Sequence, residues 1–187
     1  MITSQILQSK SLFILLQKID LDMSESASKE KCPHCGGVLH RGWHQRKPRG
    51  GPAGLEASVS IRYSLCCGEE GCRKRLLPSS VLFSGRRVYS EVVFHVVVAL
   101  RQNRVGGYTV EKLKQLFDVT RSTLSRWMQY FREIFPETPV WKLLSGILMP
   151  PVCVEKLPAS LLEHFIASGE NSEQQLILYM KALTIKV

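Results

Sequence analysis

The chain has 187 residues, which fits one medium-sized domain or two small ones. Hydrophobic residues make up 44% of it and charged residues 22%, a composition that excludes a disordered polymer. The longest wholly apolar runs, Leu12–Leu16 and Val96–Leu100, are far shorter than the roughly 18 residues of a membrane span. The 25 Lys and Arg residues outnumber the 16 Asp and Glu residues, which favours a nucleic-acid partner.

The surplus of positive charge lies in the middle of the chain. Residues 29–135 have a net charge of +11, whereas residues 1–28 and 136–187 each have a net charge of −1. A surplus that serves only solubility would be spread evenly along the chain. We therefore expect a phosphate-binding surface in residues 29–135.

Residues 1–28 are expected to be a helical or disordered N-terminal extension. Apolar residues between Gln5 and Ile19 recur loosely at helical spacing. The apolar core of this stretch is too short for a secretory signal, no small-residue cleavage site follows it, and acidic residues come next. Met23 opens a polar stretch and is an alternative start, so residues 1–22 either belong to the natural protein or are an upstream extension. The expected location is cytoplasmic, and nucleoid-associated if the protein is bacterial.

Residues 29–89 are expected to form a small β-rich unit with a basic link at its end. Glycines and prolines interrupt this segment, as is typical of short strands joined by tight turns. Residues 55–65 alternate apolar side chains with others, which predicts a strand.

Two groups of cysteines lie in the β-rich unit. Two thiolates three positions apart on a tight turn can face one metal ion, and two such turns supply the four ligands of tetrahedral zinc. The apolar face of the predicted strand continues by alternation to Cys67 and not to Cys66, which stays as the substitute. The predicted ligands of one structural Zn²⁺ ion are Cys32, Cys35, Cys67 and Cys72.

Disulfides, buried thiols and a redox dithiol at Cys32 and Cys35 are the alternatives to zinc. The expected reducing compartment favours metal for closely spaced cysteines. The remaining cysteine, Cys153, is expected in the core. The nearby histidines are expected to face solvent or phosphate: His34, His40 and His44.

Residues 90–136 are expected to form a helix-turn-helix domain. Helices are predicted over Ser90–Arg104, Thr109–Phe117 and Thr120–Phe135, the last two each opened by a threonine suited to capping. Asp118 stands where the turn requires a left-handed residue, a conformation that aspartate tolerates. The apolar residues spaced to give both short helices one core are Leu113, Phe117, Val119, Leu124 and Trp127.

The second short helix is predicted to turn a polar face away from that core. Arginine, glutamine and hydroxyl side chains read base edges and phosphates in DNA. An ordinary helical hairpin with a polar outer face is the alternative. Such a hairpin does not explain why the second helix has no acidic residue before Glu133. The predicted DNA contacts are Thr120, Arg121, Ser122, Ser125, Arg126 and Gln129.

Residues 137–187 are expected to be a helical tail, either a dimerisation region or a truncated one. Helices are predicted over Ser160–Ala167 and Ser172–Leu183.

The order of these features resembles the N-terminal zinc-ribbon plus helix-turn-helix module of bacterial insertion-sequence transposases. The resemblance covers roughly residues 30–135 and includes the segment from Arg121 to Trp127. It implies binding to double-stranded terminal-repeat DNA. The basic link is then expected to grip backbone phosphates through Arg73, Lys74, Arg75, Arg86 and Arg87.

The full transposases of this family have an acidic metal-binding triad in a later domain. The chain after residue 136 is too short for such a domain and contains no aspartate. We therefore expect an α+β protein that is not an enzyme: a transposase fragment, or an accessory or regulatory protein of an insertion sequence. A dimeric transcriptional regulator and an RNA-binding zinc-ribbon protein are the alternatives. Besides DNA, the expected partner is a homodimer mate or a separate catalytic transposase subunit, with no membrane and no small-molecule substrate.

Overall fold

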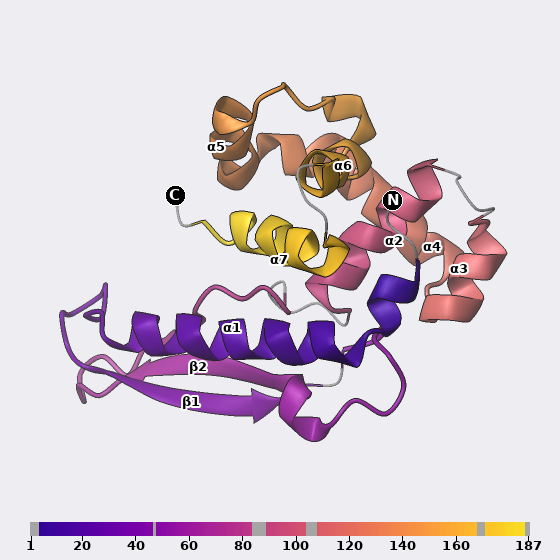
Figure 1. Ribbon diagram of the computed structural model, residues 1–187. Coiled ribbons are helices and arrows are strands. Elements are labelled where there is room, and N and C mark those ends of the chain that lie inside the picture. The colour runs from indigo at the N-terminus through magenta and orange to yellow at the C-terminus, as the bar shows by residue number, and fades with distance from the viewer. Residues whose placement is uncertain (1–3, 47, 84–88, 104–107, 168–170, 186–187) are drawn as a thin grey trace.

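The computed structural model describes residues 4–46, 48–83, 89–103, 108–167 and 171–185. These residues form an α+β fold, as the sequence predicts, with a small antiparallel sheet beside a group of helices (Figure 1). None of the helices described is long and apolar enough to cross a membrane. The elements are α1 (Lys10–Ser28), β1 (Leu39–Gln45), β2 (Ile61–Cys67), β3 (Arg75–Leu76), α2 (Glu91–Asn103), α3 (Val110–Phe117), α4 (Arg121–Gln129), η3 (Tyr130–Ile134), α5 (Pro139–Ile147), α6 (Ala159–Ala167) and α7 (Ser172–Ala182).

The sheet has the order β1-β2-β3, and α1 lies along one of its faces (Figure 1). The register of β1 and β2 runs from Leu39 opposite Cys67 to Gln45 opposite Ile61. The predicted strand over residues 55–65 is therefore wrong in its first half. The described part of β1 ends at Gln45, which pairs with Ile61, so the residues before Ile61 have no strand opposite them there. Ala57–Ser60 forms a 3₁₀ turn instead.

Helix α1 is fixed to both the sheet and the main core. Leu12, Phe13 and Leu16 are fully buried in that core. Further along α1, the Asp20 carboxylate accepts hydrogen bonds from the Val81 backbone N–H at 2.7 Å and from the Ser80 hydroxyl. Burial raises the pKa of Asp20, although both hydrogen bonds act to lower it. The helix extends nine residues beyond the predicted end at Ile19.

Helix α2 is the centre of the helical part, because every residue from Val92 to Leu100 is buried. The predicted helix Ser90–Arg104 is confirmed as far as the structure describes it, to Asn103. The predicted helix Thr120–Phe135 is α4 followed by a π-turn, η3. Helix α5 was not expected; Thr138 caps it, and a proline in its first turn fits the helix start.

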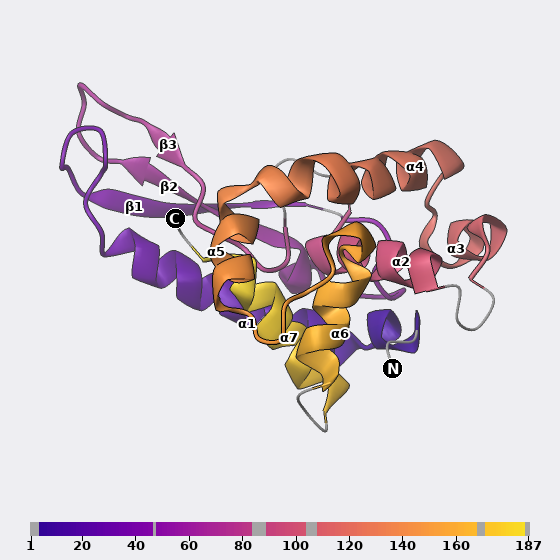
Figure 2. The same cartoon turned by 90° about the horizontal axis from the view of Figure 1, so that it is seen from above.

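The last two helices match their predicted ranges to within one residue and pack into the same core as α2 (Figure 2). The hydroxyl of Tyr179 on α7 hydrogen-bonds Nδ1 of His95 on α2. Nε2 of His95 lies 3.2 Å from Oε1 of Glu91. Burial raises the pKa of Tyr179 well above its ordinary value, so its hydroxyl stays protonated. This buried contact joins the C-terminal part of the chain to α2.

Candidate metal centre and nucleic-acid interface

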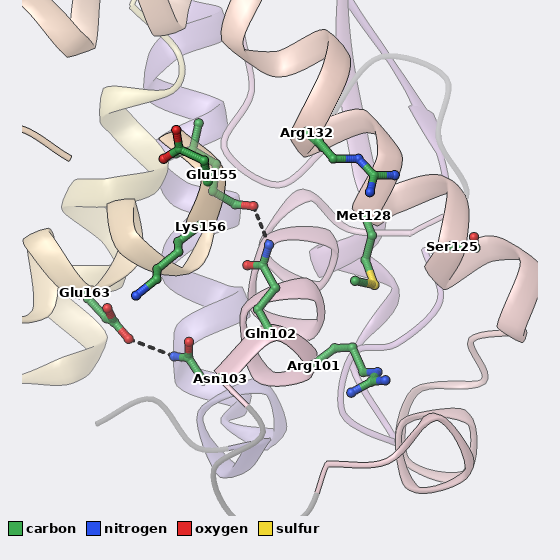
Figure 3. A pocket seen from close by; sticks show the side chains of 10 residues that line it. Arg101, Gln102, Asn103, Ser125, Met128, Arg132, Glu155, Lys156 and Glu163 are labelled. Atoms are coloured by element: carbon green, nitrogen blue, oxygen red, sulfur yellow. Dashed lines mark hydrogen bonds between the residues drawn. The ribbon is translucent and has the colours of Figure 1, made fainter. Parts of the chain in front are cut away.

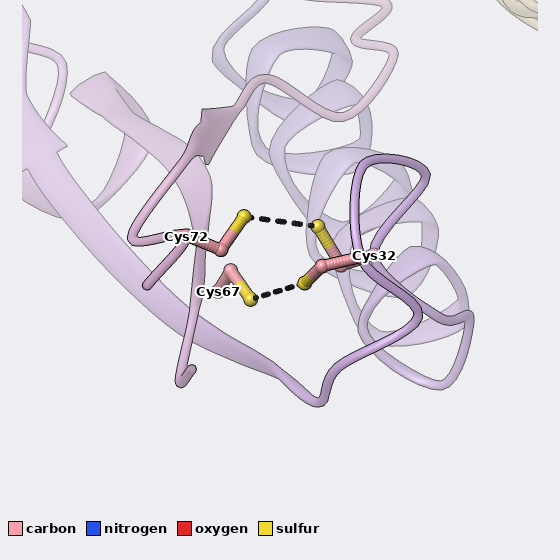
Figure 4. A group of neighbouring side chains, drawn as sticks. Cys32, Cys67 and Cys72 are labelled. Atoms are coloured by element: carbon pink, nitrogen blue, oxygen red, sulfur yellow. Dashed lines mark hydrogen bonds between the residues drawn. The ribbon is translucent and has the colours of Figure 1, made fainter. Parts of the chain in front are cut away.

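The four predicted cysteines converge at one end of the sheet (Figure 4). Their sulfur atoms all lie within 4.8 Å of one another. Sγ of Cys32 is 3.9 Å from that of Cys72, and Sγ of Cys35 is 3.4 Å from that of Cys67. Sulfurs bound at about 2.3 Å to a tetrahedral zinc lie about 3.8 Å apart. The arrangement is therefore positioned to hold a metal ion and fits four thiolate ligands.

The first cysteine pair lies on a tight turn after α1. The carbonyl of Cys32 accepts a hydrogen bond from the N–H of Gly36 at 2.8 Å. The N–H of Cys32 donates to the carbonyl of Gly37 at 2.9 Å. Gly36 has a φ of +74°, which favours glycine. At Gly37 an added Cβ would lie 3.2 Å from Sγ of Cys67. Gly36 therefore permits the turn itself, and Gly37 lets this turn approach the second one closely.

The second cysteine pair consists of Cys67, the last residue of β2, and Cys72 in the turn that follows. The N–H of Gly68 donates to the carbonyl of Val38 at 2.9 Å, which ties this turn to the start of β1. The N–H of Cys72 donates to the carbonyl of Glu69 at 3.0 Å. These hydrogen bonds fold the four residues between Cys67 and Cys72 into a turn, which places Cys72 beside the other three cysteines.

Backbone N–H groups stabilise the thiolate forms of these cysteines. The N–H of His34, and then that of Cys35, lower the pKa of Cys32 to about 7. The N–H of Gly37 also acts to lower the pKa of Cys35, but the Cys67 thiol and burial outweigh it and raise that pKa to about 12.

At Cys67 the N–H of Glu69 lowers the pKa, yet burial and the thiols of Cys32 and Cys72 leave it raised. Crowded sulfurs cannot all be negative without a compensating charge. A bound cation supplies that charge, so the group releases protons when it takes up a metal.

The neighbouring cysteine, Cys66, is outside the group. Its side chain lies on the other face of β2, opposite His40 in β1 and Arg75 in β3. Its Sγ lies 3.6 Å from the carbonyl oxygen of Cys67 and 3.8 Å from that of Arg73. The alternation along the strand therefore explains why Cys67 joins the group.

Cys153 is exposed, so its expected place in the core is wrong. Its thiol donates to Oε2 of Glu155 at 3.1 Å. The short extended segment after Pro150 and Pro151 places it at the surface.

Helices α3 and α4 are joined by the short turn that the sequence predicts. Asp118 has φ 51° and ψ 38°, the left-handed conformation. The hydroxyls of Thr109 and Thr120 cap the two helices, each accepting a backbone N–H at 3.2 Å. The apolar residues between them are buried except for the half-buried Trp127: Leu113, Phe117, Val119 and Leu124.

All six predicted DNA contacts of α4 are exposed. The Thr120 hydroxyl is occupied as the cap of the helix, so it is the least available of them. Arg126 donates to the Thr123 hydroxyl at 3.3 Å, and the Gln129 amide donates to Glu133 at 2.8 Å. Both contacts are local and exposed, and an incoming base or phosphate can replace them.

The described residues at the start of the basic link do not lie beside α4. The three residues of the link that the structure describes are all exposed: Arg73, Lys74 and Arg75. Arg75 lies on the sheet face opposite α1. The end of the sheet at which β2 ends and β3 begins lies at one end of the molecule in both views, and α4 lies at the other end (Figures 1 and 2). The other two predicted contacts, Arg86 and Arg87, lie outside the described residues.

Comparison of the chain with protein-family models, with curated proteins and with solved structures found no match.

Proposed function

We propose that this protein binds double-stranded DNA through α4, with a zinc ion stabilising the cysteine end of its sheet. The observation that supports the proposal most is the exposed surface of α4. From Val119 to Arg132 the chain contains no acidic residue but three arginines, all of them exposed. Such a surface is attracted to phosphates along its whole length.

The chemistry and rigidity of α4 suit it to the major groove. Arginine pairs with guanine and glutamine with adenine through two hydrogen bonds, so Arg121, Arg126 and Gln129 are the proposed base readers. Leu124 is buried on the opposite side of the helix, and Trp127 packs edge-on against Phe94 of α2 with ring centroids 5.1 Å apart. The reading face is thus presented by a fixed helix.

Zinc is the metal proposed for the cysteine group. Four thiolates are a typical structural zinc set, and they leave no open coordination position for substrate. The ion would cross-link the turn after α1 to the turn after β2. We assign it a structural role and assign no catalytic step to this chain.

The resemblance to insertion-sequence transposases suggests the biological setting. On this proposal the protein is an accessory or regulatory factor of a mobile element, or a fragment of its transposase. It would recognise the terminal repeats, while a separate catalytic subunit performs strand transfer.

The test is competition between duplex DNA and duplex RNA of the same sequence for zinc-loaded protein, read by fluorescence anisotropy. We expect DNA to compete better, and we expect Arg126→Gln to weaken binding. Lys142→Gln on α5, which removes an exposed lysine paired with Glu137, is the control and is expected to bind as the unmodified chain does. Better competition by RNA, or equal binding by both variants, would refute the proposed surface.

A further inference from the structure

A cleft of about 770 Å³ lies between the end of α2, the outer side of α4 and η3, and the segment that leads into α6 (Figure 3). Arg101 and Arg132 lie on one side of it, and Lys156 lies across from them with two carboxylates, Glu155 and Glu163 (Figure 3). None of the basic residues in this cleft is among the DNA contacts that the sequence predicts.

The two carboxylates of the cleft already have partners. Oε1 of Glu163 accepts the side-chain amide of Asn103 at 2.8 Å. Oε2 of Glu155 accepts the thiol of Cys153, which lowers the pKa of this carboxyl. Neither acid forms an ion pair with a basic residue of the cleft in the described part of the chain.

The basic side chains are correspondingly available. Within the described ranges Arg101 and Lys156 form no ion pair, and the one ion pair of Arg132 is with Glu133, at 3.6 Å with most of the arginine side chain exposed. Guanidinium groups bind phosphate oxygens through two parallel hydrogen bonds, and an ammonium adds a point charge. The cleft thus offers the donors that a phosphate group requires.

The walls of the cleft are held together before any ligand arrives. The side-chain amide of Gln102 on α2 donates to the carbonyl of Leu157 at 2.7 Å, and its oxygen accepts the N–H of Ala159 at 3.3 Å. Leu157 is buried at the base of that segment. The segment with Lys156 is therefore fixed to the helix with Arg101, and little ordering is needed to bring the charges together.

The cleft is continuous with the surface of α4. Ser125, one of the predicted DNA contacts, also lines the cleft, and Arg132 lies two helical turns further along the same side. We infer that this cleft binds phosphate groups of the DNA backbone alongside α4, through Arg101, Arg132 and Lys156. The inference rests on the proposed function, since it concerns the strand that flanks the bases read by α4.

The test measures duplex affinity of the full-length, metal-loaded chain between 50 and 200 mM salt, roughly the range in which phosphate contacts dominate. A duplex of arbitrary sequence suffices, because these contacts do not depend on sequence. Removing one phosphate-binding side chain flattens the log–log slope by about 0.9. We expect the triple variant Arg101→Gln, Arg132→Gln, Lys156→Gln to flatten it by about 2–3, and Lys181→Gln on α7 to leave it unchanged. Circular dichroism confirms that each variant is folded.

The possible failures are distinguishable. If the unmodified chain does not bind duplex at all, the proposed function fails and this inference with it. If the chain binds and Arg126→Gln weakens binding but the triple variant keeps the original slope, the cleft is wrong and the proposed function stands. The cleft could instead bind free phosphate. Titration with inorganic phosphate, monitored through the Nε resonances of Arg101 and Arg132, tests this alternative ligand. Saturation by free phosphate together with an unchanged slope would also overturn the DNA assignment.

Discussion

Cys66 and Cys67 are neighbours in β2 whose side chains lie on opposite faces of the sheet. Cys67 is fully buried in the cysteine group, whereas the Cys66 thiol lies near the backbone carbonyls of Cys67 and Arg73. This pair supplies a matched test of the metal site, because both substitutions change a thiol to a hydroxyl within the same strand.

We expect Cys67→Ser to lower metal content well below one ion per chain and to make the protein sensitive to chelators. Cys66→Ser is expected to retain about one ion per chain, since four thiolates remain for a tetrahedral ion. Elemental analysis of the two purified variants checks this. Equal metal content in both variants would show that the four-cysteine group is not the site.

Metal binding is expected to depend on pH. At pH 7 the Cys35 thiol, with a pKa of about 12, and the Cys67 thiol, whose pKa is also raised, are both protonated without metal. Each bound ion therefore releases at least two protons, and the apparent affinity rises with pH. Calorimetry of zinc binding in two buffers of different ionisation enthalpy measures the release. A heat independent of the buffer would contradict the proposed thiolate ligation.

The turn between α3 and α4 makes a prediction about Asp118. A left-handed conformation costs roughly 1–2 kcal/mol for an L-residue, and it is worst for β-branched ones. Asp118→Val is expected to lower the free energy of unfolding by about 1–2 kcal/mol. For Asp118→Gly the relief of strain offsets the greater freedom of the unfolded chain, so we expect a change within about 0.5 kcal/mol.

Both Asp118 variants remove the same exposed ion pair with Arg49, which contributes little. The difference between their urea unfolding curves therefore reports the backbone alone. Equal destabilisation by valine and glycine would mean that Asp118 acts through its carboxylate instead.

Tyr179→Phe tests how firmly α7 is joined to α2. Removing the hydroxyl leaves Nδ1 of the buried His95 without its Tyr179 partner, at a cost of about 1–3 kcal/mol. Thermal unfolding of the variant measures this cost, with Tyr63→Phe in β2 as the control. If the two substitutions have the same effect, the buried contact does not stabilise the protein.

Local patterns in the sequence were enough to predict the cysteine group and most helices. The alternation toward Cys67 and the threonine caps at Thr109 and Thr120 depend only on neighbouring residues, and the structure has both. The left-handed Asp118 is likewise a local requirement of a short turn.

The remaining features depend on contacts between distant residues. The strand begins at Ile61 rather than at residue 55 because its partner ends at Gln45, which alternation along one segment does not reveal. The contact between Asp20 and Val81 and the cleft around Lys156 join parts of the chain more than fifty residues apart. Such contacts leave no periodic signal in either segment.

Selection from a pool of random-sequence duplexes is the sharpest test of the proposal that α4 reads DNA sequence. We expect the zinc-loaded protein to enrich one consensus, and we expect Arg126→Gln to relax preference at a single base pair, by about 1–3 kcal/mol. A pool that stays random after repeated selection by folded, metal-loaded protein would contradict the claim.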